Sequence, residues 1–174
     1  TACFSEDVTG QRIQKAKQYM TRASFISASV YGAENPNTTF IDAQIGHLSL
    51  RQGDLQDAYK KFTKQSMSVI KTFGEYAKKH VSMANSHMNM GQYYIAKANE
   101  AANKMDTLKV RQFAEQALEE FKLSENICDV IYGKGSPSVV SVLQGMAQTY
   151  LLLQQPEVAI DKYYKNKTEE VLRT

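Results

Sequence analysis

The chain has 174 residues, of which 43% are apolar, and it carries a formal net charge of +3. This length suits one compact domain or four to five repeated units of roughly 34–42 residues. The charge is too small to argue for nucleic-acid binding, and no apolar run approaches the roughly 18–20 residues that span a bilayer. Proline (3) and glycine (9) are scarce, so we expect an all-helical chain with essentially no strand.

The first predicted helix covers residues 6–31 and carries apolar residues mostly at three- and four-residue steps, which indicates one stripe. This stripe consists of Ile13, Ala16, Met20, Ala23, Phe25, Ile26 and Val30. Gly32 is expected to end the helix, and Asn35-Pro36 to force a turn.

A helical hairpin is predicted next, with arms at 36–52 and 55–73. Thr38 or Thr39 is the expected N-cap of the first arm. Gly53-Asp54 separates the two arms.

The following pair of helices is longer. Its first arm is predicted from about Tyr76, and the most plausible turn is Met105-Asp106-Thr107, where Asp106 or Thr107 would cap an arm that runs to about Ile131. A last pair is predicted at 137–153 and 156–172.

A short sequence motif of the form Tyr-Gly-x-x-x-Pro occurs twice, as Tyr31-Gly32-Ala33-Glu34-Asn35-Pro36 and as Tyr132-Gly133-Lys134-Gly135-Ser136-Pro137. One and the same interval separates a small residue from a helix-ending glycine in three places: Ala16 to Gly32, Ala58 to Gly74, and Ala117 to Gly133. Such periodicity predicts a repeat array, and repeat arrays commonly form binding surfaces.

The helical pairs resemble the tetratricopeptide repeat, which places small residues where its two helices cross and often a glycine in the turn. The matching residues are Gly46, Gly53, Ala58 and Phe62 in the first complete unit, Ala84, Gly91 (at the turn), Ala117 and Phe121 in the second, and Ala147, Tyr150, Ala159 and Tyr163 in the third. The extra length of each unit and the Tyr-Gly-x-x-x-Pro linker resemble the kinesin-light-chain-like subclass.

This resemblance implies a right-handed superhelix of antiparallel helical hairpins, an all-α solenoid that spans residues 1–174 as one array. The array would comprise the second helix of a partial repeat (6–31), a repeat (36–73), an elongated repeat (76–132) and a final repeat (137–172). Because the chain starts at Thr1 without a methionine, we expect it to be a fragment of a longer protein.

The elongation is placed between Gly91, interpreted as the turn, and Ala117. It would add about ten residues to each arm and extend the hairpin by ~15 Å, with an alanine-rich seam that includes Ala98, Ala101, Ala102 and Ala114. Either it is a tolerated insertion, or it is a docking tip that carries Tyr93, Tyr94 and Ile95.

The expected function is that of a non-enzymatic scaffold or adaptor that binds a peptide, helix or loop of another protein along the inner face of the first helices. The predicted groove residues are Phe40, Ala43, His47, Leu50 and Arg51, then Lys78, Val81, Asn85, Met88 and Asn89, then Ser141, Gln144, Gln148, Leu151 and Leu152. One alternative is a structural subunit of a large ciliary, axonemal or transport assembly, held by its ends and edges. An RNA-binding helical repeat is a more distant alternative.

No catalytic constellation stands out, so we expect no enzyme activity, no cofactor and no metal. The three histidines, His47, His80 and His87, lack a third ligand at a recognisable spacing. Cys3 and Cys128 are far apart and are expected to be reduced thiols. We expect no nucleic-acid or membrane partner and a cytoplasmic location, with cytoskeletal or ciliary association as the narrower expectation. The basic clusters Lys60-Lys61-Lys64 and Lys78-Lys79 leave an acidic partner as a minority interpretation.

Overall fold

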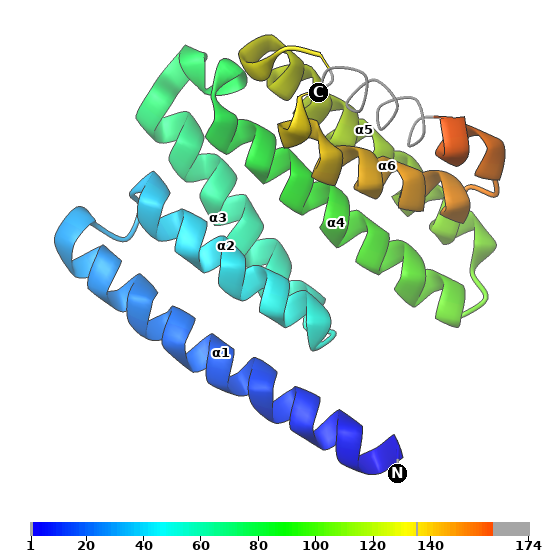
Figure 1. Ribbon diagram of the computed structural model, residues 1–174. Coiled ribbons are helices and arrows are strands. Elements are labelled where there is room, and N and C mark those ends of the chain that lie inside the picture. The colour runs from blue at the N-terminus through cyan, green and yellow to red at the C-terminus, as the bar shows by residue number, and fades with distance from the viewer. Residues whose placement is uncertain (1, 135, 162–174) are drawn as a thin grey trace. The chain divides into compact units, whose positions relative to one another are not determined.

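The computed structural model describes residues 2–134 and 136–161. It divides into two compact units, unit 1 (Thr1–Gly74) and unit 2 (Glu75–Thr174), each of which is described by itself. The described residues form helices joined by short turns, without a strand (Figure 1). The prediction of an all-helical chain is therefore confirmed for this part of the sequence.

Unit 1 contains α1 (Ala2–Tyr31), α2 (Pro36–Arg51) and α3 (Leu55–Phe73). α2 and α3 form a hairpin whose turn contains Gly53 in the left-handed region, at φ 77°, where glycine is favoured. The core of the hairpin is the fully buried ring of Phe62, which lies directly on Gly46: a Cβ at Gly46 would be 2.7 Å from the ring. The predicted crossing of Gly46 with the second helix is thus confirmed.

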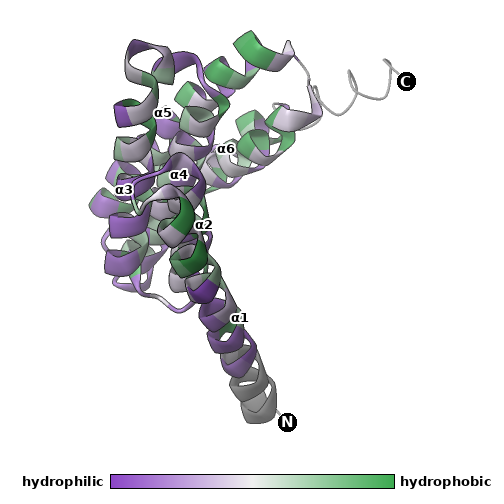
Figure 2. Ribbon diagram, turned by 90° about the vertical axis from the view of Figure 1, so that its left-hand side faces the viewer, coloured by the Kyte–Doolittle hydropathy of each residue, from purple (hydrophilic) through white to green (hydrophobic). Residues whose placement is uncertain are grey.

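α1 lies on α2, and its predicted apolar stripe is confirmed only in part, because Ile13, Ala16 and Ala23 are partly buried whereas the second half of the stripe is exposed. Phe25, Ile26 and Val30 are exposed, whereas Ser27 is buried and its hydroxyl lies 2.7 Å from that of Thr38. The contact between the two helices is built from small and polar side chains, which an apolar periodicity does not detect. Purple, polar turns recur along α1 in Figure 2, whereas green is concentrated on helices such as α6.

The 3₁₀ segment η1 (Gly74–Lys79) begins at the last residue of unit 1 and continues into unit 2. Unit 2 further contains α4 (Val81–Asn103), α5 (Thr107–Tyr132), the 3₁₀ turn η2 (Pro137–Val139) and α6 (Val140–Leu152). Residues 156–161 are again helical. The predicted start of the first arm near Tyr76 is wrong, because 3₁₀ structure occupies that stretch. The rest of the predicted 156–172 helix, with Tyr163, lies outside the described residues.

α4, α5 and α6 meet at the fully buried ring of Phe121. A Cβ built on Gly91 of α4 would lie 2.7 Å from this ring, and one built on Gly145 of α6 would lie closer still. Because real Cβ atoms do not approach so closely, both glycines are needed for the three helices to pack at this distance.

Gly91 is therefore a packing residue inside α4, and its predicted role as the turn is wrong. Gly53 follows Gly46 by seven positions, whereas Met105, at the centre of the observed turn, follows Gly91 by twice as many. The second arms differ in the same way. The cap of α3, Asp54, lies four positions before Ala58, whereas the cap of α5, Asp106, lies eleven positions before Ala117. Each arm is longer by seven residues, or about two turns and ~10 Å, in place of the predicted ten residues.

The segments of α2, α4 and η2–α6 begin with the same capping contact. The side chain of the residue before each segment accepts a hydrogen bond from the backbone N–H two residues further along, at 2.9, 3.2 and 3.3 Å. The capping residues are Asn35, His80 and Ser136, so the predicted cap at Thr38 or Thr39 is wrong. Eleven positions after each cap the residue is small: Gly46, Gly91 and Ala147. This constant register is the firmest internal repeat of the chain.

Candidate protein-interaction surfaces

A cleft lies in unit 2 between the tip of the α4–α5 hairpin and the end of α6. The arms of the hairpin have 23 and 26 residues and α6 has 13, and the longer hairpin reaches past the end of α6 (Figure 1). The space between them has a volume of about 740 Å³. Most of the side chains that line it are aliphatic or carry an amide group. The lining residues are Ala102, Met105, Thr107, Val110, Arg111, Glu115, Leu151, Leu152, Leu153, Gln154 and Gln155.

Large apolar side chains at this cleft remain accessible to a partner. Met105 is 90% exposed and Leu151 is 58% exposed, and Leu108, in the first turn of α5, is 78% exposed. Side chains of this size are the usual anchors of protein interfaces when they lie in a concave surface. The cleft can therefore receive an apolar segment of another protein.

The tip of the hairpin is held in a defined conformation. Met105 adopts a left-handed backbone, at φ 56°, and the N–H of Asp106 donates to the carbonyl of Ala101 at 3.0 Å. The carboxylate of Asp106 accepts from the N–H of Lys109 at 3.1 Å and pairs with its ammonium at 2.9 Å. The hydrogen bond from the Lys109 side chain is the main cause that lowers the pKa of Asp106. A rigid tip reduces the entropy lost when a partner binds.

Beneath the tip, small residues form the seam between the two arms. Ala98, Ala101 and Ala114 are buried, so the predicted alanine seam is confirmed at these positions, whereas Ala102 is exposed. Such small side chains allow two helices to approach closely. The extension is therefore a packed two-helix structure.

The predicted docking residues Tyr93, Tyr94 and Ile95 are not at the tip. They lie in the middle of α4, within about one turn after Gly91, and are only partly exposed. The error follows from the assignment of Gly91 to the turn. The accessible tip residues are Met105 and Leu108, which the sequence analysis did not select; the Asp106 cap that follows Met105 was the available signal.

The predicted groove residues of α6 lie on one exposed face. Gln144 and Gln148 are exposed, as is Leu151 at the cleft. Ser141 is on the same face, and Leu152 is partly buried.

The predicted residues of α4, which contacts α6, are less accessible. Val81, Asn85 and Met88 are partly buried, and Asn89 is buried, so its side chain is not available on this surface. Lys78 is exposed in η1. Of the residues predicted for unit 2, the structure brings only Leu151 and Leu152 to the cleft.

The predicted residues of unit 1 are all on α2. Phe40 and Arg51 are exposed, Leu50 is partly buried, and Ala43 is buried. His47 packs on Phe62, with the ring centroids 5.0 Å apart, so it contributes to the core beside Gly46.

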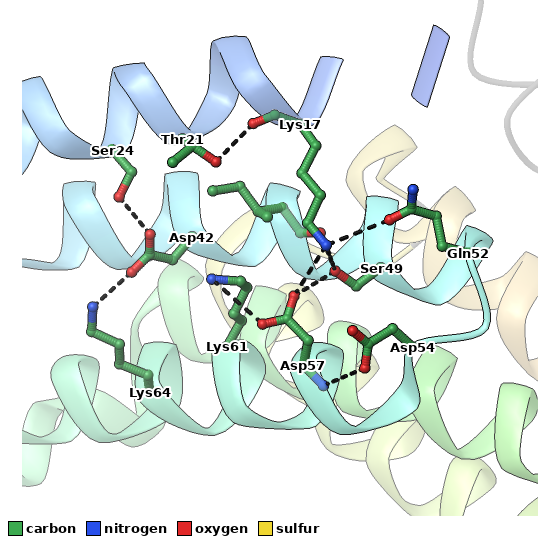
Figure 3. A network of polar contacts seen from close by, with 11 residues as sticks. Lys17, Thr21, Ser24, Asp42, Ser49, Gln52, Asp54, Asp57, Lys61 and Lys64 are labelled. Atoms are coloured by element: carbon green, nitrogen blue, oxygen red, sulfur yellow. Dashed lines mark hydrogen bonds and ion pairs between the residues drawn. The ribbon is translucent and has the colours of Figure 1, made fainter. Parts of the chain in front are cut away.

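A chain of polar contacts connects α1, α2 and α3 on one side of unit 1 (Figure 3). Asp42 of α2 accepts a hydrogen bond from Ser24 of α1 and pairs with Lys64 of α3 at 2.7 Å. Burial raises the pKa of Asp42, but the hydrogen bonds from Lys64 and Ser24 and the charges of Lys64 and Lys61 lower it more, so it lies below its ordinary value. These three side chains link all three helices.

A second cluster of the same network lies nearer the N-terminus of α3. Asp57 pairs with Lys17 of α1 at 3.5 Å and with Lys61 at 3.8 Å. Ser49 of α2 accepts a hydrogen bond from Lys17 at 2.9 Å and donates one to Asp57. No sequence pattern indicates this network, because its members are far apart along the chain.

Groups with catalytic potential are engaged in structural contacts. His80 caps α4, and His87 lies 2.7 Å from Glu120. Burial is the main cause that raises the pKa of the Cys128 thiol. Among the side chains that the structure describes, those of residues 10–134 and 136–161, no group of three histidine, cysteine, aspartate or glutamate residues could hold a metal ion.

No family model matches the chain, and no curated protein matches it. None of the helices in the described part of the chain has the length and apolar composition that crossing a bilayer requires.

Proposed function

We propose that this chain is a non-enzymatic protein-interaction module that binds a segment of a partner in the cleft between the α4–α5 tip and the end of α6. The observation that carries the proposal is the combination of a cleft of about 740 Å³ with the exposed side chains of Met105 and Leu151 at it. A monomeric protein gains nothing in stability by leaving such side chains exposed in a concave site, whereas a partner gains by covering them.

The partner segment would be short and mainly apolar with a polar rim. Arg111 and Glu115, which pair with each other at 2.9 Å, line the cleft together with the amides of Gln154 and Gln155. These groups can hydrogen-bond to the backbone or polar side chains of a helix or loop, while the aliphatic lining takes its apolar side chains.

We further propose that the units are repeats of the tetratricopeptide kind. Two observations support this proposal: the constant interval from the helix cap to a small residue, and the burial of an aromatic ring against a glycine in both hairpins. Arrays of such repeats commonly serve as scaffolds.

The test is a peptide selection against the folded chain. Peptides from a phage-displayed library should bind the wild type, and their affinity should fall about tenfold or more in Leu151→Glu, because a buried unpaired charge would face the apolar peptide. Leu123→Glu, on α5 and outside the cleft, is the matched control and should leave the affinity unchanged. If all selected peptides bind both variants equally, the cleft is not the binding site.

A further inference from the structure

Unit 1 has two hollows that share an unusual composition. One is shallow, lies on α1 alone and is lined by Gln14, Lys17, Gln18, Thr21, Arg22 and Phe25. The other lies on α3 beside Glu34 and is lined by residues that include Tyr59, Lys60, Lys64 and Met67, with a volume of about 630 Å³. Each hollow combines an exposed aromatic ring with basic side chains.

The polar network connects the helices that carry these hollows. Lys17 belongs to the α1 hollow and pairs with Asp57 of α3, while Lys64 belongs to the α3 hollow and reaches Asp42, which also binds Ser24 of α1. Figure 3 shows Lys17 and Ser24 directed from α1 toward Lys61 and Lys64 of α3. The two hollows therefore lie on helices that one polar network joins.

Positive charge exceeds negative charge on this surface. The carboxylates of the polar network and the hollows are already paired with lysines: Glu34 with Lys71, Asp42 with Lys64, and Asp57 with Lys17 and Lys61. Arg22 and Lys60 line the hollows and have no ion-pair partner among the residues that the structure describes. The electrostatic complement of such a surface is an anionic ligand.

Apolar contacts restrict the kind of anion. Phe25 is 75% exposed, Met67 is 65% exposed and Tyr59 is 45% exposed. A ligand that covers them must carry apolar groups between its negative charges. An anionic membrane surface also attracts basic side chains that lie beside apolar ones, so vesicles are included in the test below. Nucleic acid is a poor fit, because two unpaired cations give little of the phosphate neutralisation on which its affinity depends.

We propose that the α1 and α3 hollows form a docking surface for an acidic peptide segment of a partner protein, with Arg22 and Lys60 binding its carboxylates and Phe25, Tyr59 and Met67 covering its apolar side chains. This surface lies in unit 1, whereas the cleft of the proposed function lies in unit 2. Each of the two sites can therefore bind its own ligand while the other is empty.

The probe is a fluorescein-labelled peptide of about 15 residues that contains mainly glutamate with interspersed phenylalanine and leucine. A second peptide has glutamine in place of glutamate, and a third has alanine in place of the apolar residues. Fluorescence anisotropy measures binding of each to the full chain. We expect the first peptide to bind most tightly, and about tenfold or more weaker binding when salt is raised from about 50 to about 300 mM.

The decisive variant is Arg22→Glu combined with Lys60→Glu, which should weaken binding of the acidic peptide about tenfold or more. The matched control is Arg12→Glu combined with Lys122→Glu, which changes the net charge equally at exposed positions outside both hollows and should retain binding within about twofold. Circular dichroism should show unchanged helix content for both. Phe25→Ala combined with Met67→Ala tests the apolar contribution and should also weaken binding.

Three results would overturn the proposal. Equal binding of the glutamate and glutamine peptides would show that the charges do not contribute. Equal weakening by the control variant would show that the attraction is to the overall charge of the chain. Tighter binding of a 15-nucleotide poly-uridine RNA, or of phosphatidylcholine vesicles with about one-third phosphatidylserine, would identify a different class of ligand. Variants of the unit 2 cleft report on the proposed function separately.

Discussion

At Phe121, three helices meet because two of them carry glycine where the ring lies. The ring is fully buried and has no room to move away, since Gly91 and Gly145 both contact it. An added methyl group must therefore displace either the ring or a whole helix. The close approach of α6 to Phe121 therefore depends on glycine, which has no side chain, at position 145.

We predict that Gly145→Ala lowers the free energy of unfolding by about 1–3 kcal/mol, because overpacking at this crossing outweighs the gain in helix propensity. Urea denaturation followed by circular dichroism measures the change. Gly10→Ala is the matched control: Gly10 is also within a helix but has no atom within 4 Å of its added Cβ, so this variant should gain up to about 1 kcal/mol.

Phe121→Leu should rescue part of the loss in the Gly145→Ala background, because a smaller side chain makes room for the methyl group. If Gly145→Ala alone is as stable as the wild type, α6 does not lie as close to α5 as the structure has it.

At the element scale, polar contacts hold α1 against the hairpin of unit 1. Asp42 is central, because it binds Ser24 of α1 and Lys64 of α3 at once. Its pKa is lower in the folded state than in the unfolded state, where it takes its ordinary value. The contribution to stability is therefore fully present above that ordinary value and is lost as the pH falls through the lower folded pKa.

We predict that Asp42→Asn lowers the free energy of unfolding by about 1–2 kcal/mol near pH 7 by removing a charge-assisted contact. The difference from the wild type should shrink as the pH falls through the lowered folded pKa of Asp42, below which the wild-type carboxyl is protonated as well. Urea denaturation between pH 2 and 7 provides the test. Glu34→Gln, which breaks the exposed pair with Lys71, should have a much smaller effect because water and salt screen it. A pH-independent difference for Asp42→Asn would contradict the assigned charge pair.

The elements themselves are predictable where local signals are strong. The predicted bounds of α3 are confirmed residue for residue and those of α2 to within one, because Gly53-Asp54 and Gly74 mark their ends. On α1 the predicted stripe holds at Ile13, Ala16 and Ala23, which are partly buried. The polar contacts of this helix could not be predicted, because they are made by hydroxyls and a lysine whose partners are distant along the chain. The role predicted for Gly91 is wrong because a glycine inside a helix and one in a turn look alike unless the packed aromatic ring is known.

The candidate site was predicted only in part, for a related reason. Leu151 was selected from its position on α6, and the structure places it at the cleft. Met105 and Leu108 were not selected, because their importance depends on where the hairpin turns. The error at one glycine thus carried over to the predicted docking residues.

At the scale of the whole molecule, the hairpins share one register, and the α4–α5 hairpin differs from α2–α3 by an insertion of seven residues in each arm. Seven residues are close to two full turns, so the insertion lengthens both arms while preserving the faces that pack on each other. Ala98 accordingly lies two turns beyond Gly91 on the same seam, where it is fully buried. The shorter hairpin shows that the extension is not required for the crossing below it.

We predict that deletion of residues 96–102 together with 107–113 leaves unit 2 folded, because Gly91, Ala117 and Phe121 keep their mutual register and the turn with its Asp106 cap is retained. The melting temperature should fall by less than about 10 °C, since only the contacts of the seam are lost. Deletion of residues 96–102 alone is the matched control. It shortens one arm by two turns, displaces the turn and should be far more destabilising.

The double deletion also removes one wall of the cleft, so a peptide that binds there should lose its affinity although the remaining fold persists. Circular dichroism and fluorescence anisotropy on the same sample separate the two effects. Aggregation of the double-deletion variant, or a broad melt like that of the control, would show that the extension supports the adjacent helices. A cooperative melt with lost peptide binding would show that the extension serves the interaction, since a purely structural insertion would leave binding intact.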